Sequence, residues 1–259
     1  MQNPGIKLNR PKMTDCIRKT SEEIKHWIDT DNRNQINKII QSPLPTREDP
    51  LIQPLLVPET QEIIQESEKT VFGSYTPMSS PGKLTIDFQQ HLNIAQHILI
   101  ESYLNPAFKS GQNLLAAIQD LLSWLTYASM NITYNHELFH HYCEIIQNIH
   151  IFTRMPDPEE SMAVAFSLSK FVAPDYPDYL SREQKSELKH TFLDERVFRY
   201  KPPYDKNDCF RNQRGDFKYH KVLSYIFATS QVNATLVTEL LEKLFSKMGP
   251  LHVEVEIEV

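Results

Sequence analysis

Residues 131–153 contain no proline or glycine and carry apolar side chains at helical intervals, so they predict an unbroken helix. The apolar positions are Leu138, Phe139, Ile145, Ile146, Ile149 and Phe152. Within this helix, His136, Glu137 and His140 form the pattern H-E-x-x-H. Residues four apart stand one above the other on a helix face, so both imidazoles can reach one metal ion. The pattern constrains the fold, because another element must supply the remaining ligand.

This spacing is that of a catalytic zinc site. The two histidines ligate Zn²⁺, and Glu137, which is not a ligand, is placed to take a proton from the metal-bound water. The metal lowers the pKa of that water to about 7 and keeps one position open for substrate. The pattern can also arise by chance in a chain with 10 histidines. Burying such a polar group in an apolar helix is costly without a partner, and a metal removes that cost.

A third protein ligand is expected from a following helix. Pro158 suits the first turn of such a helix, and the acidic residues beside it suit the positive end of the helix dipole. Glu160 follows His140 by 160 − 140 = 20 positions. That length lets the first helix finish, the chain turn, and a second helix return alongside. Glu159 is the neighbouring alternative.

The H-E-x-x-H residues and segment 160–166 together resemble the gluzincin family of zinc metallopeptidases. Many members carry the third ligand on an E-x-x-A segment, and Ala163 matches its alanine. The resemblance therefore implies a zincin-like fold in which His136, His140 and Glu160 hold Zn²⁺. It also implies that the chain hydrolyses peptide bonds with Glu137 as the catalytic residue.

The chain departs from the family pattern at three positions, as a divergent member would. Val164 replaces the aspartate or asparagine that orients a ligand histidine in relatives, so another group must do this. Glu144 and Asp120 are the candidates. Phe139 stands where glycine is common, and Asn135 stands where a small apolar residue is common. Neither change prevents metal binding.

Residues 71–75 and 82–88 predict two strands joined by a loop rich in proline and serine. The second strand alternates Leu84, Ile86 and Phe88 with Lys83, Thr85 and Asp87. Residues 251–259 alternate valine and isoleucine with glutamate, which predicts a strand with an acidic face, suited to a sheet edge. We therefore expect an α+β fold, mostly helical, with a small antiparallel sheet. The resemblance implies that its edge strand pairs with an extended peptide; a purely structural hairpin is the alternative.

Five prolines in residues 42–58 predict an extended connector. We therefore expect a helical N-terminal extension with its connector over residues 1–58 and a zincin-like domain over residues 59–259. Residues 20–40 should be helical, with a polar interruption at 29–34. Further helices are predicted over residues 59–70, 90–103, 112–129, 160–172, 182–198, 217–230 and 234–248.

Composition narrows the partners and the compartment. A net charge of −6 with no basic patch argues against nucleic acid as the main partner. The chain has no apolar run long enough to span a membrane, and residues 1–20 lack the apolar core of a secretory signal. Three widely spaced cysteines, Cys16, Cys143 and Cys209, favour reduced thiols and a cytoplasmic protein. Cys143 is expected to pack in the core rather than ligate the metal.

A ferritin-like di-iron bundle is the first rival interpretation. E-x-x-H units at Glu23/His26, Glu137/His140 and Glu187/His190, together with Glu101 and Glu160, follow the order of such a site. If Glu137 and Glu160 each lie near the start of their own helix, they are roughly 20 Å apart along the bundle, which argues against it.

The second rival is a non-catalytic zincin-like interaction domain, which the intact Glu137 disfavours. For the enzyme, His220, Tyr219 and Tyr225 are candidate oxyanion donors. His141 and His150 are expected to be bystanders. The interpretation that the sequence favours is a zinc metallopeptidase that acts on a peptide or protein substrate.

Overall fold

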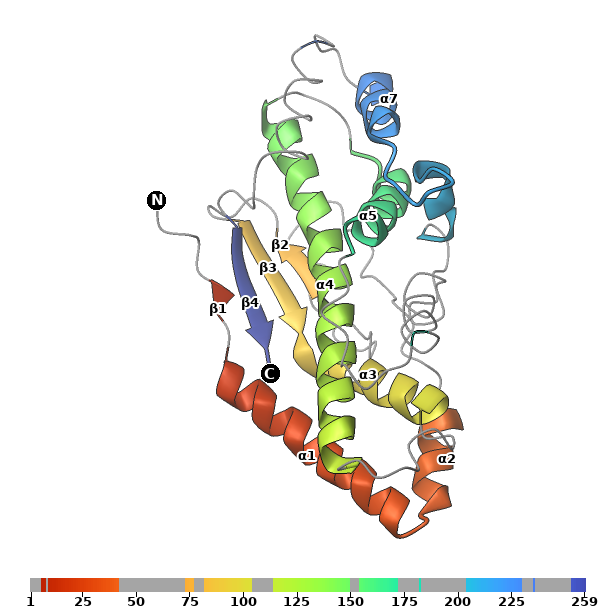
Figure 1. The fold of residues 1–259 in the computed structure, drawn as a ribbon. Coiled ribbons are helices and arrows are strands. Elements are labelled where there is room, and N and C mark those ends of the chain that lie inside the picture. Colours follow the sequence, from red (N-terminus) through yellow and green to blue (C-terminus); the bar gives the residue numbers. More distant parts are fainter. Residues whose placement is uncertain are drawn as a thin grey trace, which may run out of the picture.

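The computed structural model describes residues 6–7, 9–41, 73–76, 82–103, 114–149, 154–171, 204–229 and 253–259, with residues 182 and 235. These residues form a mostly helical α+β fold around one small sheet (Figure 1). Within this described part of the chain, no helix combines the length and the apolarity that crossing a membrane requires.

The sheet has four strands in the order β1-β4-β3-β2. They are β1 (Ile6–Lys7), β2 (Gly73–Thr76), β3 (Gly82–Asp87) and β4 (Val253–Glu258). β2 and β3 form the predicted antiparallel hairpin, but β4 pairs in parallel with both β3 and β1. The prediction of an antiparallel sheet is therefore wrong. A parallel pair needs a long crossover, and the helices between β3 and β4 provide one. β4 is also an inner strand, not the expected edge.

The described helices overlap the predicted ones, with the main differences at α1 and α4. They are α1 (Arg10–Asp29), α2 (Arg33–Gln41), α3 (Phe88–Tyr103), α4 (Leu114–Ile149), α5 (Pro156–Lys170) and α7 (Tyr219–Thr229), with a 3-10 helix η4 (Tyr204–Phe210). α4 is a single helix of 36 residues where two helices were predicted. Nothing at Met130 or Asn131 breaks it, because neither residue is a proline or a glycine.

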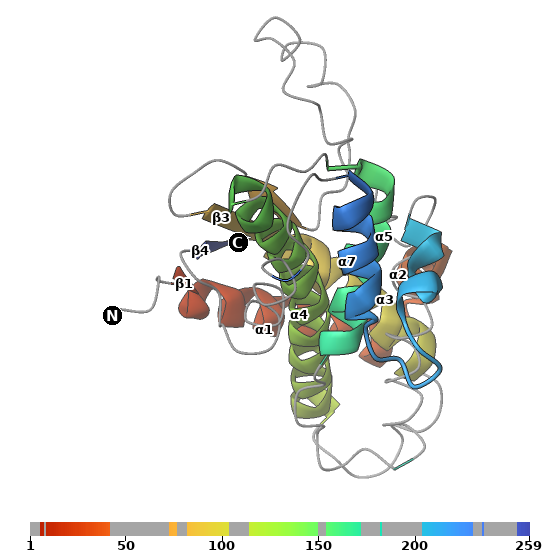
Figure 2. The same ribbon diagram turned by 90° about the horizontal axis from the view of Figure 1, so that it is seen from above.

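α4 lies between the sheet on one side and α5 and α7 on the other, as both ribbon views show (Figures 1 and 2). Its first half, with β3, α3 and α1, forms one hydrophobic core that contains Leu84, Leu92 and Leu121. Its second half, with α5, α7 and the segment before α7, forms another that contains Phe139, Phe166 and Phe217. The H-E-x-x-H residues lie where the first core gives way to the second.

The N-terminal residues belong to the same assembly of elements. β1 pairs with β4, and Met13, Ile17 and Ile24 of α1 are buried in the first core. α1 starts earlier than predicted, at a cap where the Asn9 side chain accepts a hydrogen bond from the backbone N–H of Lys12. The predicted interruption is confirmed between α1 and α2. The proline-rich connector and the predicted helices 59–70, 182–198 and 234–248 lie outside the described residues apart from 182 and 235.

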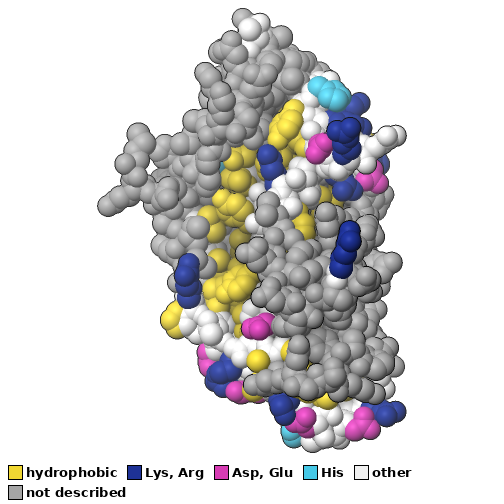
Figure 3. Space-filling view, viewed as in Figure 1, with side chains coloured by type: hydrophobic (Ala, Val, Ile, Leu, Met, Phe, Trp, Pro, Cys, Tyr) yellow, Lys and Arg dark blue, Asp and Glu magenta, His cyan; other side chains and the backbone are white. Residues whose placement is uncertain are grey.

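The described surface mixes charges of both signs. On the face drawn in Figure 3, Lys and Arg side chains lie among Asp and Glu, and hydrophobic side chains form a band along the middle. All three cysteines are free thiols: Cys143 is buried, Cys16 is half-buried and Cys209 is exposed.

Candidate metal centre

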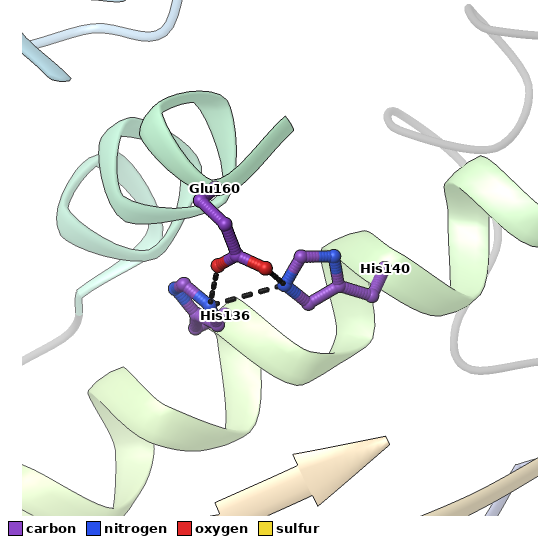
Figure 4. A group of neighbouring side chains, drawn as sticks. All are labelled: His136, His140 and Glu160. Atoms are coloured by element: carbon purple, nitrogen blue, oxygen red, sulfur yellow. Dashed lines mark hydrogen bonds and ion pairs between the residues drawn. The ribbon is translucent and has the colours of Figure 1, made fainter. Parts of the chain in front are cut away.

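Three side chains from two helices converge on one point. α4 supplies His136 and His140, and Glu160 comes from the first turns of α5 with its carboxylate facing both imidazoles (Figure 4). Nε2 of His136 lies 3.1 Å from Oε2 of Glu160, and Nε2 of His140 lies 3.2 Å from Oε1. The two Nε2 atoms are themselves 3.1 Å apart. The structure thus brings together the predicted ligand set and selects Glu160 for it.

These distances match the spacing of ligands around a small metal ion. Bonds of about 2.0–2.1 Å in a tetrahedral zinc site separate the ligand atoms by about 3.3 Å. The two imidazole nitrogens lie 3.1 Å apart, and each lies 3.1–3.2 Å from a different oxygen of Glu160, close to that spacing. Among the described residues this is the only group found that could hold a metal ion.

Hydrogen bonds alone do not account for this arrangement of two nitrogens and one carboxylate. A ring N–H can point to one acceptor, so Nε2–H of His136 and Nε2–H of His140 can each serve a carboxylate oxygen of Glu160. No hydrogen is then left to join the two nitrogens, which nevertheless lie in contact. One cation would satisfy both lone pairs and the carboxylate together. The donor set therefore fits a metal better than it fits a hydrogen-bonded cluster.

The group is buried, with His136 only 1% exposed. In the metal-free chain, burial lowers the pKa of His140, but the charge of Glu160 and hydrogen bonds to Glu159 and Glu160 outweigh it. The pKa of His140 is therefore held well above its ordinary value. Burial likewise raises the pKa of Glu160, and the charge of His140 and hydrogen bonds from both histidines overcome this, holding it well below its usual range.

Glu159 orients His140. Its Oε1 lies 2.8 Å from Nδ1 of His140, on the side of the ring away from Glu160, and its side chain is fully buried. An ionised carboxylate only accepts hydrogen bonds, so Nδ1 carries the hydrogen and Nε2 keeps its lone pair for a metal. Sequence reasoning left Glu159 as a rival ligand and looked for the orienting group in Glu144 or Asp120. Asp120 is exposed, and the hydrogen bond to Nδ1 of His140 comes from Glu159.

Arg154, which lies just before α5, holds the carboxylate of Glu159. The sequence analysis assigned it no role. Arg154 donates from Nε to Oε2 of Glu159 at 2.8 Å and from Nη2 to Oε1. Burial raises the pKa of Glu159, but the hydrogen bonds from Arg154 and His140 outweigh it and lower that pKa overall. The only sequence signal was a lone arginine in the connection between two helices that carry metal-ligand residues.

Glu137, the predicted base, is buried on α4 beside the edge strand β2. Gly73 of β2 passes so close that a Cβ there would lie 3.6 Å from Cγ of Glu137. The same Cβ would lie 2.6 Å from Cγ2 of Thr133 and 3.0 Å from the carbonyl oxygen of Thr85. Only glycine allows this approach, which brings the outer strand of the sheet against the helix that carries the site.

The three candidate oxyanion donors all lie on α7. Tyr219 and His220 are exposed at the start of α7, and Tyr219 packs on Phe217. Tyr225 is buried, but its hydroxyl accepts a hydrogen bond from the backbone N–H of Met155 at 2.5 Å.

Other residues singled out from the sequence are placed as follows. Cys143 is buried in the second core and outside the ligand group, as predicted, and burial holds the pKa of its thiol well above the ordinary value. His141 is buried and also outside the group. Of the residues proposed for a di-iron site, Glu23 and His26 are exposed on α1, while Glu187 and His190 lie outside the described part of the chain.

Glu137 lies deep within the long helix α4 and not near the start of its own helix, so the predicted separation of roughly 20 Å from Glu160 does not apply. Glu160 therefore packs against the histidines on either side of Glu137.

The chain matches no protein-family model, no curated protein and no solved structure. Its function therefore has to be inferred from the residues of the site.

Proposed function

We propose that this protein is a zinc-dependent peptide-bond hydrolase, a divergent zincin-like metallopeptidase of the gluzincin type. The observation that carries the proposal is the convergence of Nε2 of His136, Nε2 of His140 and the carboxylate of Glu160, with separations of 3.1–3.2 Å that suit the ligands of a tetrahedral ion. Three protein ligands leave a fourth position for water or substrate, which is the arrangement of a catalytic zinc site rather than a structural one.

Zinc bound there would lower the pKa of a water molecule and polarise the scissile carbonyl. Glu137 follows His136 directly, so its carboxylate starts from the same turn of α4 as the ligands. In the proposed reaction Glu137 accepts a proton from the attacking water as the oxygen bonds to the carbonyl carbon. The protonated Glu137 then delivers that proton to the leaving amine as the C–N bond breaks.

β2 is the proposed docking strand for the substrate. It ends the sheet, so among the described strands its outer edge has no neighbour, and an extended peptide could add there by backbone hydrogen bonds. Gly73 brings this strand next to Glu137. A peptide paired with β2 would therefore run past the proposed base and the metal ligands, which favours a peptide or protein substrate.

The donor set alone does not select zinc, because two histidines and one carboxylate also bind Fe(II) in oxygenases. The decisive test is metal analysis of the purified protein by mass spectrometry, with His140→Ala and Glu137→Gln prepared in parallel. We expect about one zinc per chain in the wild type and in Glu137→Gln, and none in His140→Ala. Glu137→Gln should hydrolyse a peptide library about 10²–10⁴-fold more slowly than the wild type.

The control is Glu23→Gln, which removes an exposed carboxylate of α1 and should leave metal and activity unchanged. Iron in place of zinc would overturn the zinc assignment, and two irons per chain would favour the di-iron alternative. A wild type that binds no metal after zinc is supplied would overturn the proposal altogether.

A further inference from the structure

A chain of contacts runs from the candidate metal ligands to the residues just before α5. Glu159 faces His140 with Oε1, and both of its oxygens are held by the guanidinium of Arg154. Arg154 lies just before α5, in a half-buried position. The arginine thus contacts the metal centre only through Glu159.

The turn that carries Arg154 is itself fixed from a third helix. The hydroxyl of Tyr225 on α7 accepts a hydrogen bond from the backbone N–H of Met155, at 2.5 Å, and donates one to the carbonyl oxygen of the same residue, at 3.4 Å. Met155 is the capping residue of α5 and has no side-chain hydrogen bond for this purpose. Tyr225 therefore ties α7 to the residue next to Arg154.

We propose that Arg154 is a positioning residue for metal binding, which sets the orientation of His140 through Glu159, with Tyr225 holding the turn from which it acts. The proposal rests on the proposed function, because it concerns how tightly that site holds zinc. Arg154 hydrogen-bonds Glu159 and Tyr225 hydrogen-bonds Met155, and neither is one of the three candidate ligands.

The geometry requires an arginine. A guanidinium is planar and donates two parallel hydrogen bonds, so it fixes the plane of a carboxylate as well as its position. Here Nε and Nη2 of Arg154 each donate to a different oxygen of Glu159. The plane of the carboxylate is thereby fixed with Oε1 directed to Nδ1 of His140. A lysine supplies charge at one point and leaves the carboxylate free to rotate. Groups that orient a ligand histidine change metal affinity by about 10–100-fold.

The test is zinc affinity, measured by competition with a chromophoric chelator, for the wild type, Arg154→Ala, Arg154→Lys and Tyr225→Phe. We expect Arg154→Ala to bind zinc at least about tenfold more weakly. Arg154→Lys should recover only part of that loss, and Tyr225→Phe should show a smaller loss in the same direction. Arg211→Ala is the matched control, because Arg211 is a similarly buried arginine paired with Asp208 on η4, and it should bind zinc as the wild type does.

A spectroscopic readout separates positioning from general stability. ¹⁵N NMR of the histidine rings in the zinc-loaded protein should show Nδ1 of His140 protonated and hydrogen-bonded in the wild type, and this signal should shift in Arg154→Ala. Unchanged zinc affinity and an unchanged ring signal in that variant would overturn the inference while leaving the zinc site intact. If Arg154→Ala does not fold, the inference is tested with Arg154→Lys and Tyr225→Phe. Zinc affinity equal to that of the wild type in both variants would overturn the inference. A wild type that binds no zinc refutes the proposed function instead.

Discussion

His140 is held at both ring nitrogens by adjacent residues of one helix: Nδ1 lies 2.8 Å from Oε1 of Glu159, and Nε2 lies 3.2 Å from Oε1 of Glu160. Neighbouring side chains diverge around a helix, so two consecutive glutamates can reach opposite edges of one imidazole. The two glutamates have different proposed roles. Glu160 faces the candidate metal position, and Glu159 fixes the tautomer of His140 that leaves its Nε2 available to a metal.

Replacing Glu159 tests whether it orients His140 for metal binding. Glu159→Gln keeps an oxygen that can accept from Nδ1 but removes the charge that makes the ring a stronger ligand, so we expect zinc affinity to fall about tenfold. Glu159→Leu removes the acceptor and should cost closer to 100-fold. Asp157→Asn, an exposed acid in the same first turn of α5, is the control for loss of negative charge. Equal affinity in Glu159→Leu and the wild type would show that Glu159 does not orient the ligand.

Metal removal should destabilise the protein. Zinc that binds only the folded chain stabilises it by about 2.7 kcal/mol when free zinc is about 100 times Kd. For a chain of this size that corresponds to a rise in Tm of roughly 5–10 °C. Calorimetry or circular dichroism should therefore show a lower Tm after chelation, restored by zinc. His140→Ala should show no zinc-dependent shift, and a shift of the same size in that variant would place the metal elsewhere.

The metal-free and zinc-bound forms should respond oppositely to rising pH. The raised pKa of His140 adds stability that is fully present below its unfolded value of 6.5 and is lost as pH rises through the folded pKa, which lies well above. The lowered pKa of Glu160 adds stability above its ordinary value of 4.5, lost as pH falls through the folded pKa. Zinc requires His140 without its Nε2 proton, so zinc affinity rises with pH over the same window.

Denaturation at pH 7 and pH 9, with and without zinc, measures this difference. Calorimetric titration in two buffers of different ionisation enthalpy should also detect release of a proton on binding. Binding at pH 7 without proton release would show that the neighbouring carboxylates do not keep His140 protonated in the metal-free chain.

Gly73→Ala probes the contact between the edge strand and the site helix. The new methyl group would meet Cγ2 of Thr133 at 2.6 Å, so we expect a loss of about 1–3 kcal/mol in stability and slower peptide hydrolysis. Thr133→Ser removes that Cγ2 and should restore part of the loss in the double variant, measured by a double-mutant cycle. The recovery is partial because the Thr85 carbonyl oxygen remains 3.0 Å away. Additive effects of the two substitutions would show that the two residues do not interact.

The sequence alone predicted most of the elements and the ligand set. Helical spacing put His136 and His140 on one face, and the alternation in residues 82–88 and 251–259 predicted two of the strands that form. These are local properties, because the repeat of a helix or a strand fixes which side chains share a face. The same patterns predicted two helices where α4 is one. The apolar repeat of a continuous helix is the same as that of two helices that meet at Met130, so the repeat does not distinguish them.

Tertiary structure decided what local pattern does not encode. The direction of β4 beside β3, and its place inside the sheet, depend on how the intervening helices return the chain. The choice between Glu159 and Glu160 depended on how α5 packs on α4, because consecutive residues differ by about 100° around a helix and only packing sets which one faces both histidines. The Arg154–Glu159–His140 chain joins residues from two helices and the turn between them. Residue spacing therefore identified which atoms could bind a metal, and packing determined how they are held.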